Sequence, residues 1–227
     1  MHRRALLVVL LAVLGLSACS SAAPARPRAT APAMTSRPPD AAVSFVVVGD
    51  SITAGPIPIQ ATGPQEQDVQ QFGRGSWLPE AKGAPLRFLG GWAVSGATTE
   101  EMRAGVVHAK ADVVVVMAGT NDVLRMVPWE QTRANLLAIV DRVGVHDVVL
   151  SAVPPADPSP SAREEFNDRL RSLADKRGWH LVDPWVSVEQ HGRWTPGASA
   201  DGVHPTQATA DAAGEVLRAA VLDVADD

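Results

Sequence analysis

Apolar runs alternate with amphipathic stretches along most of the chain. Three continuous β-prone runs span Val43–Val48, Val113–Met117 and Asp147–Val153, and two weaker ones span Leu86–Leu89 and His180–Val182. Between them, apolar residues recur at helical spacing over Thr99–Ala109, Trp129–Val143, Ser161–Arg177 and Thr206–Val224. Continuous apolar runs are typical of strands buried on both faces of a parallel sheet. The alternation predicts an α/β fold, a three-layer α/β/α sandwich around a mostly parallel five-stranded sheet.

Residues 1–19 have the layout of a secretory signal. A basic start is followed by the apolar stretch Ala5–Leu16 and then by small residues. This stretch is too short for a comfortable transmembrane helix, which needs about 20 residues. The sequence Leu-Ser-Ala-Cys at 16–19 resembles a bacterial lipoprotein signal, which implies lipidation at Cys19 and anchoring on the outer side of the cytoplasmic membrane. The alternative is ordinary cleavage after Ala23, which would discard Cys19.

Residues 20–40 are rich in Pro, Ala, Ser and Thr and have no apolar period, so we expect a flexible tether. Residues 41–227 are long enough for one compact domain but not for two. Of the 227 residues, 20 are Lys or Arg and 25 are Asp or Glu, and the part after Asp40 keeps 15 and 24 of them, about −9 in charge. A chain this acidic, with no basic run, is a poor binder of nucleic acid.

Residues with chemical potential follow the apolar runs. Gly49-Asp50-Ser51 comes after the first run, Gly119-Thr120-Asn121-Asp122 follows Val113–Met117, and Asp201-Gly202-Val203-His204-Pro205 precedes the last predicted helix. A further block, residues 91–99, contains Gly96. In this order the four blocks resemble the signature of the SGNH, or GDSL, hydrolase superfamily over nearly the whole domain. We therefore expect a flavodoxin-like sheet whose strands end, on their carboxyl side, at an active site.

The residue types agree with nucleophilic catalysis. A serine hydroxyl such as that of Ser51 is a weak nucleophile and needs a neighbouring base. His204 is the natural base, because the imidazole pKa of ~6.5 lies near working pH. Asp201 is three residues away and can reach the other ring nitrogen. The resemblance implies an oxyanion hole made of the Ser51 and Gly96 backbone N–H groups and the Asn121 side-chain amide. The Gly-x-Ser-x-Gly motif of α/β-hydrolases is absent from the sequence.

Several residues have a plainer interpretation. Ser51 alone could cap the following helix. Asp50 and Asp122 are expected to brace their turns, and Asp183 is a rival to Asp201 for orienting the histidine. The tryptophans at 77, 92, 129, 185 and 194 could line an acyl or sugar site, although tryptophans are more often core or rim residues.

The sequence thus predicts a serine esterase or lipase that cleaves carboxylic esters through an acyl-enzyme, with no metal and no cofactor. Its substrate would be a small-molecule, lipid or glycan ester, and we expect residues 56–83 to set selectivity. One alternative is a catalytically silent envelope lipoprotein that binds glycan or lipid. Another is a metal-dependent phosphoesterase built on Asp50, Asn121, Asp122 and His204. The oligomeric state cannot be read from the sequence.

Overall fold

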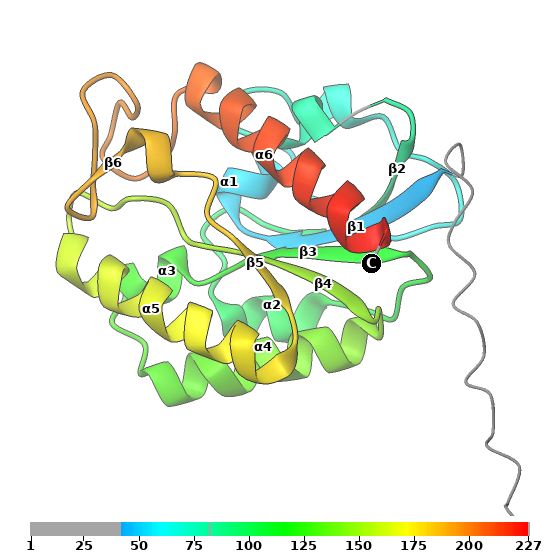
Figure 1. The fold of residues 1–227 in the computed structure, drawn as a ribbon, viewed down its shortest axis with the longest axis horizontal. Coiled ribbons are helices and arrows are strands. Elements are labelled where there is room, and N and C mark those ends of the chain that lie inside the picture. The colour runs from blue at the N-terminus through cyan, green and yellow to red at the C-terminus, as the bar shows by residue number, and fades with distance from the viewer. Residues whose placement is uncertain (1–41, 82, 227) are drawn as a thin grey trace, which may run out of the picture. The chain divides into compact units, whose positions relative to one another are not determined.

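The computed structural model describes residues 42–81 and 83–226. Five strands form the central sheet: β1 (Val43–Gly49), β2 (Leu86–Ala93), β3 (Val113–Met117), β4 (Asp147–Ser151) and β5 (His180–Val182). They are all parallel, in the order β2-β1-β3-β4-β5 (Figure 1). This is the flavodoxin-like order, and it confirms the predicted α/β fold. The proposed signal, the Cys19 site and the tether lie outside the described residues.

Helices cover both faces of the sheet. They are α1 (Ser51–Ala54), α2 (Thr99–Gly105), α3 (Thr120–Leu124), α4 (Trp129–Val143), α5 (Pro160–Arg177) and α6 (Gln207–Asp226). Helices α2, α4 and α5 lie on one face and α6 on the other (Figure 1). A small hairpin, β6 (Glu189–Gln190) with β7 (Arg193–Trp194), follows the short 3-10 helix η3 (Val186–Val188). The three predicted layers are therefore present.

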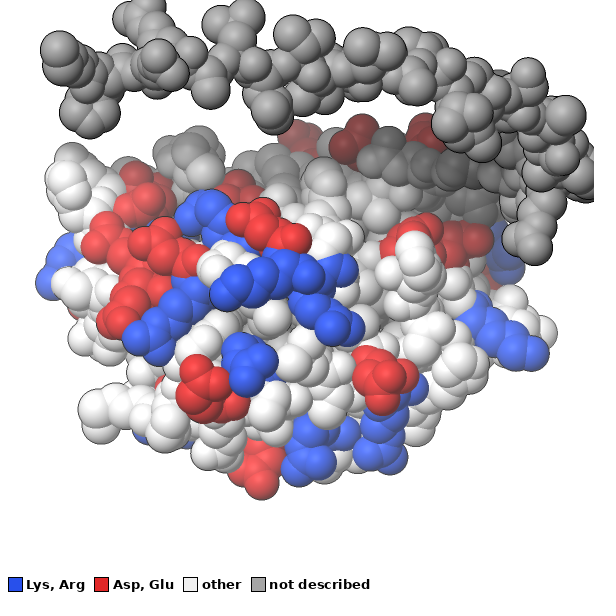
Figure 2. All heavy atoms as spheres, turned by 60° about the horizontal axis from the view of Figure 1, so that its bottom comes forward, with Lys and Arg blue, Asp and Glu red and all other residues white. Residues whose placement is uncertain are grey.

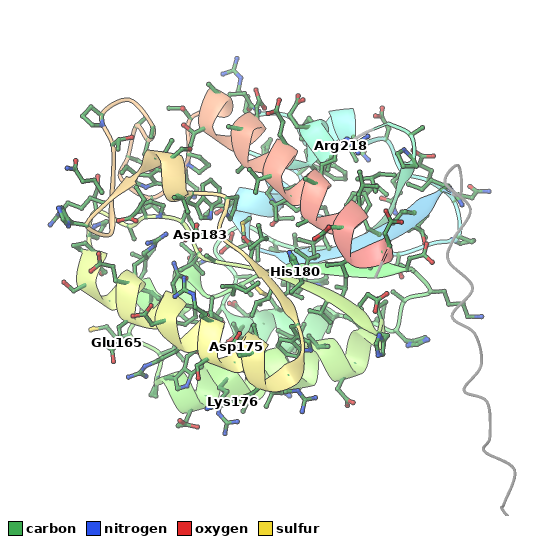
Figure 3. All side chains as sticks on the ribbon, viewed as in Figure 1. Glu165, Asp175, Lys176, His180, Asp183 and Arg218 are labelled. Atoms are coloured by element: carbon green, nitrogen blue, oxygen red, sulfur yellow. The ribbon has the colours of Figure 1, made fainter. Side chains whose placement is uncertain are left out.

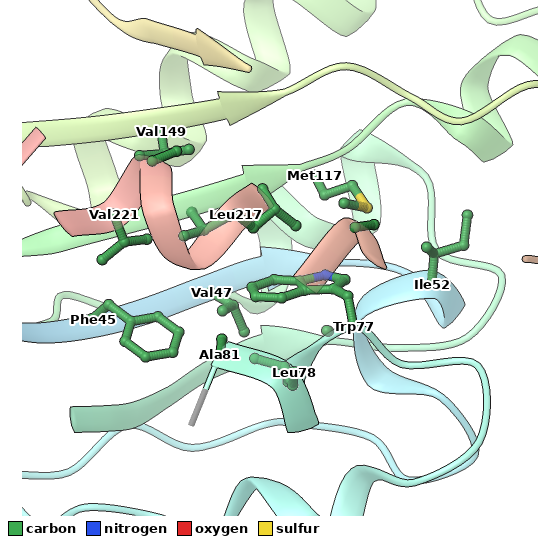
Figure 4. Packing of buried hydrophobic residues seen from close by; sticks show 14 of the residues in the cluster. Phe45, Val47, Ile52, Trp77, Leu78, Ala81, Met117, Val149, Leu217 and Val221 are labelled. Carbon is green, nitrogen blue, oxygen red and sulfur yellow. The ribbon is translucent and has the colours of Figure 1, made fainter. Parts of the chain in front are cut away.

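The period-two alternation of the strands divides the core into two halves. In β1, Phe45 and Val47 face α6, whereas Val46 and Val48 face α2 and α4. Figure 4 shows the first half, in which Leu217 and Val221 of α6 pack over Val47, Val149 and Met117. The other half contains the apolar face of α5, residues Phe166, Leu170 and Leu173, as the sequence predicts. Both faces of the sheet are buried, which explains the continuous apolar runs.

The ends of some elements differ from the predicted ends. Strand β2 runs on to Ala93, past two glycines that hide it from a pattern analysis, at a register shift against β1. Strand β4 stops at Ser151, because the N–H and C=O groups of Val153 bond the Asn167 side chain instead of a neighbouring strand. Helix α2 ends at Gly105, since Val106 has an extended backbone.

The segment expected to set selectivity has regular structure in its described part, residues 56–81. They contain two 3-10 helices, η1 (Val69–Phe72) and η2 (Leu78–Ala81), and Ile59 forms a β-bridge with Ala93. The fully buried Trp77 donates from its indole to the Thr53 hydroxyl at 3.1 Å. The second half of this segment is thus part of the core beneath α6 (Figure 4).

The outer helices carry mixed charge. Arg133 pairs with Glu130 on α4, and Arg171 pairs with Asp168 on α5. Figure 2 shows Lys and Arg interspersed with Asp and Glu on this face. Within the described residues, no helix is both long and apolar enough to cross a membrane.

Candidate active site

The three residues predicted to form a triad meet at the carboxyl end of the sheet. Ser51 begins α1, directly after β1, and His204 and Asp201 lie in the loop before α6. The Ser51 Oγ is 2.9 Å from the His204 Nε2, and the His204 Nδ1 is 2.8 Å from the Asp201 Oδ2. Residues 153 positions apart therefore form one hydrogen-bonded chain from hydroxyl to imidazole to carboxylate. The His204 and Asp201 side chains are 48% and 56% exposed, so the site is open to solvent.

Asp201 is fixed in place by its own loop. Its Oδ1 accepts from the backbone N–H groups of Val203 and His204, at 2.9 and 2.8 Å. Partial burial raises the pKa of Asp201, but these hydrogen bonds and the imidazole outweigh it and lower that pKa to about 2. The carboxylate facing the imidazole is therefore ionised at neutral pH.

Asp183, the rival partner for His204, is engaged elsewhere. Its Oδ1 accepts from the Trp185 N–H at 3.0 Å, and its Oδ2 is 3.8 Å from the buried Arg163 guanidinium. Figure 3 shows Asp183 just beyond the end of β5. The structure therefore places Asp201, not Asp183, beside the histidine.

Asp50 is buried under the candidate nucleophile. Its Oδ1 accepts from the Ile52 N–H at 3.0 Å and so caps α1. Complete burial raises the pKa of Asp50 from 3.8 to about 6, although the hydrogen bond from Ile52 works in the opposite direction. Asp50 thus braces its turn, as expected, and this role requires that its carboxyl group be buried.

The three expected oxyanion donors differ in how free they are. Within the described residues, the backbone N–H groups of Ser51 and Gly96 donate to no other group of the protein. The Asn121 amide instead donates to the Ala97 carbonyl at 3.0 Å and, more weakly, to the Asp50 Oδ2 at 3.4 Å. A substrate oxygen would have to replace the longer of these two contacts.

Asp122 braces its loop, as expected. Its carboxylate accepts from the Thr99 N–H and hydroxyl and from the Thr132 hydroxyl, which ties α3 to α2 and α4. The carboxylate oxygens of Asp122 and Asp50 thus accept hydrogen bonds from neighbouring donors and do not point toward a common metal position. Across 42–81 and 83–226, no group of three or more His, Cys, Asp or Glu side chains is arranged to hold a metal ion.

Most of the tryptophans that were candidates for a binding surface belong to the core. Trp77 and Trp185 are fully buried, and Trp194 stacks edge-on against Trp185 with ring centres 5.7 Å apart. Trp92 and Trp129 are partly buried against the core half that contains α2 and α4. The tryptophans are therefore chiefly packing residues.

The sequence model of the GDSL-like lipase/acylhydrolase family matches residues 47–212. The chain belongs to this family. Its members are ester hydrolases of the serine type, and the family match includes the blocks at Gly49–Ser51, Gly96, Gly119–Asp122 and Asp201–His204. No match was found among curated proteins.

Solved structures of the same fold come from several organisms. A G-D-S-L family protein described as lipolytic from Desulfitobacterium hafniense is 16% identical, with a TM-score of 0.61 over 78% of this chain and 99% of its own. A GDSL-like lipase from Bacteroides thetaiotaomicron is 18% identical, with a TM-score of 0.57 over 79% and 88%. A carbohydrate esterase of family 3 from Talaromyces cellulolyticus is 16% identical, with a TM-score of 0.58 over 81% and 98%. At such identities the likeness establishes the shared fold.

Sequence reasoning missed supporting residues around the site. The Ser199 hydroxyl donates to the His204 carbonyl at 2.6 Å and accepts from the Gly202 N–H at 2.9 Å, which closes the histidine loop. Arg125, at the end of α3, donates to the Gly96 carbonyl at 2.8 Å. A serine five residues before the histidine carries no distinctive pattern. The position of Arg125 is marked by its spacing, because a residue one helical turn after Asn121 projects from the same side of a helix.

Proposed function

We propose that this protein cleaves carboxylic esters through an acyl-enzyme intermediate, with Ser51 as nucleophile, His204 as general base and Asp201 as the residue that orients the imidazole. The observation that carries the proposal is the continuous pair of contacts, 2.9 Å from Ser51 to His204 and 2.8 Å from His204 to Asp201. Distances of this kind satisfy the geometric requirement for a nucleophile and its base.

The reaction follows from these contacts. The His204 Nε2 removes the Ser51 proton as the Oγ attacks the ester carbonyl, and the imidazolium then protonates the departing alcohol. A water molecule, activated by the same nitrogen, hydrolyses the acyl-serine and returns the free acid. The ionised Asp201 keeps the Nδ1 protonated, so that the Nε2 can accept the proton.

The negative oxygen of the tetrahedral intermediate needs donors. The unengaged N–H groups of Ser51 and Gly96 can supply two hydrogen bonds, and the Asn121 amide can supply a third by giving up its 3.4 Å contact with Asp50. Removal of one such donor costs about 10²–10³ in kcat in other serine hydrolases. We assign that order of loss to Asn121→Ala, measured with a soluble aryl ester.

A fluorophosphonate probe tests the nucleophile directly. The wild-type protein should be labelled at Ser51, as located by peptide mass analysis, and Ser51→Ala should lose both labelling and ester cleavage. Ser199→Ala is a matched control, because this hydroxyl bonds the histidine loop but is not the nucleophile, so labelling at Ser51 should persist. Full ester cleavage by Ser51→Ala would refute the proposal.

The substrate class is a second part of the proposal. Because the His204 and Asp201 side chains are about half exposed, we propose small or projecting acyl esters that reach an open site, whether carried by a lipid or by a glycan. A series of p-nitrophenyl esters from acetyl to palmitoyl measures acyl preference. A maximum of kcat/KM at acetyl or butyryl would support an open, shallow site, whereas a maximum at palmitoyl would require a long acyl channel and contradict it.

A further inference from the structure

The turn that presents Gly96 is held by side chains from α3. Asn121 lies in α3 and Arg125 is the C-cap residue that follows this helix, one helical turn later, so the two side chains project from the same side. Asn121 donates to the Ala97 carbonyl at 3.0 Å, and Arg125 donates to the preceding carbonyl, that of Gly96, at 2.8 Å. Two consecutive carbonyls are thus bound, one by a side chain of this short helix and the other by that of its C-cap residue.

The backbone conformation of this turn explains why these two side-chain hydrogen bonds matter. The Ala97 N–H donates to the Val94 carbonyl at 3.1 Å, which closes a four-residue turn with Gly96 in third place at φ +76°. Turns with a positive φ in third place differ from the commoner kind in the direction of their central peptide. Here the central peptide joins Ser95 to Gly96 and carries the Gly96 N–H, so a flip of this one peptide would turn the N–H away.

Arg125 binds the peptide that follows this central peptide. The peptide between Gly96 and Ala97 is bound on both sides, its N–H by Val94 and its C=O by the Arg125 guanidinium. A hydrogen bond from a charged donor at 2.8 Å is among the stronger kinds in proteins. The other partner of Arg125 is Glu101, at 3.9 Å, and an exposed ion pair at this distance contributes little by itself. The bond to Gly96 is therefore the consequential contact of this arginine.

Glu101, the weaker partner of the guanidinium, is itself bound to the start of α2. Its carboxylate accepts from the Thr98 N–H at 2.8 Å and from the Thr98 hydroxyl at 2.9 Å, one residue beyond the carbonyl that Asn121 binds. The Arg125 side chain is 55% exposed and so is held by these polar contacts rather than by packing. Its loss would free the turn without opening a cavity in the core.

We propose that Arg125 is a positioning residue that keeps the Gly96 N–H directed toward the reacting carbonyl oxygen. The proposal rests on the proposed function, because it needs the Gly96 amide to act as an oxyanion donor. A donor to the oxyanion stabilises the transition state more than the bound ester, so its misdirection lowers kcat rather than raising KM.

Arg125→Met keeps most of the aliphatic stem and removes the donors. We expect kcat for p-nitrophenyl acetate to fall about tenfold with KM within twofold, a loss smaller than that of a deleted donor because the peptide still visits the productive direction. Arg125→Lys, whose ammonium can still donate, should recover most of kcat. Arg133→Met, which removes an exposed arginine paired with Glu130 on α4, is the matched control and should leave kcat unchanged.

A double-mutant cycle separates positioning from general stability. If Asn121 and Arg125 hold the same turn, the combined loss in kcat of Asn121→Ala with Arg125→Met will be smaller than the product of the single losses. Wild-type kcat in Arg125→Met, strictly multiplicative losses, or failure of the lysine variant to recover activity would each overturn the proposal. Labelling of Ser51 by the fluorophosphonate in wild-type protein shows independently whether the proposed function holds, so the two failures are distinguishable.

Discussion

Three aspartates of this protein show how the surroundings of a side chain decide its role. Asp201 is half exposed, bonded by three donors of its own loop, and its pKa is lowered to about 2. Asp50 is buried, and its pKa is raised to about 6. Asp183 faces Arg163 and the Trp185 N–H instead of the histidine. The same carboxyl group is thus an ionised orienting group, a buried brace or a partner of a buried arginine, depending on what surrounds it.

The role of Asp201 can be tested with an almost isosteric change. In Asp201→Asn the amide oxygen can still accept from the Val203 and His204 N–H groups, so the loop should keep its shape. The NH₂ group, however, would face the His204 Nδ1 and favour the tautomer that cannot accept the Ser51 proton. We expect kcat to fall by about 10²–10⁴ with an unchanged melting temperature. Asp183→Asn is the control. A loss of kcat in this variant as large as that in Asp201→Asn would contradict the assignment of the orienting role to Asp201.

The buried Asp50 makes stability depend on pH. Its pKa is higher in the folded protein than in the unfolded chain, so the folded state binds more protons between pH 4 and 6. The contribution of Asp50 to the free energy of unfolding therefore falls as pH rises through this window and is constant above it. A shift from 3.8 to about 6 corresponds to roughly 3 kcal/mol.

Asp50→Asn should remove the part of the pH dependence of the free energy of unfolding that Asp50 causes. Urea unfolding at intervals from pH 4 to pH 7 measures this free energy in both proteins, and the variant should gain stability relative to wild type as pH rises. A constant difference between the two proteins over this range would show that Asp50 does not titrate there. Asp183→Asn serves again as the control for a carboxyl group near the same end of the sheet.

At the scale of residues, the sequence predicts those site residues that stand in short motifs next to predicted strands and helices. Ser51, Asp201 and His204 stand in short blocks at the ends of predicted elements, and the structure brings them together. The spacing of Arg125 from Asn121 can be read from the sequence, but its contact with Gly96 cannot, because that contact depends on the direction of a turn some 30 positions away. The engagement of Asn121 with Ala97 and Asp50 was likewise unreadable, since it requires the orientation of a side chain.

At the scale of elements, the long periodic segments are the predictable ones. Strand β3 and helix α4 have the predicted bounds, because a continuous apolar run marks the first and a terminal glycine at 144 marks the second. The weaker run His180–Val182 also has the bounds of its strand, β5. The pattern gives no bounds for the short helices α1 and α3, although a helix is expected after Ser51. Each has five residues or fewer, too few for a helical period, yet each carries candidate site residues at the end of a strand. The least predictable elements are thus the ones that bear the chemistry.

Gly119 shows how closely α3 is fitted to its neighbours. It has φ +122°, and a Cβ added there would lie 2.2 Å from the Phe166 ring of α5. Gly119→Ala should therefore destabilise the protein by about 1–3 kcal/mol and displace Asn121, lowering kcat. Gly178→Ala at the end of α5 is the matched control, with φ +67° and open space for the added carbon.

Thermal unfolding and steady-state kinetics on both glycine variants separate strain from site geometry. Both should lose stability, because an alanine is strained at either backbone conformation. Loss of kcat is expected in Gly119→Ala alone. Equal kinetics in the two variants would show that α3 tolerates the displacement, and that the position of Asn121 does not depend on this contact.

At the scale of the whole molecule, chain order and sheet order account for the site. The strands lie side by side in the order β2-β1-β3-β4-β5, so β1 and β3 are neighbours and Ser51 and Asn121 follow adjacent strands. Helix α6 returns across the face of β1 and β3, which brings the preceding loop, with His204, over Ser51. The alternating pattern predicts the layers, but the register between strands and the path of residues 56–83 depend on packing that the pattern does not encode.

The described part of the chain also makes a prediction about the residues before it. Residues 42–226 supply the five strands and the helices on both faces, and the site residues lie among them. We therefore propose that residues 1–40 direct and anchor the protein without contributing to catalysis. A chain beginning at Ala41 should have the kcat/KM of the full-length protein for p-nitrophenyl acetate, and its urea unfolding should be a single transition.

Anchoring itself is tested at Cys19. In a bacterium that processes lipoproteins, the full-length protein should incorporate an alkyne fatty acid and sediment with membranes, whereas Cys19→Ala should lose the label and leave the membrane fraction. The one-cysteine composition makes the labelling unambiguous. Unlabelled wild-type protein in the medium, with an N-terminus just after Ala23, would instead indicate ordinary signal cleavage. Because the Ala41 chain reports activity separately, this result would change the location of the enzyme but not its proposed chemistry.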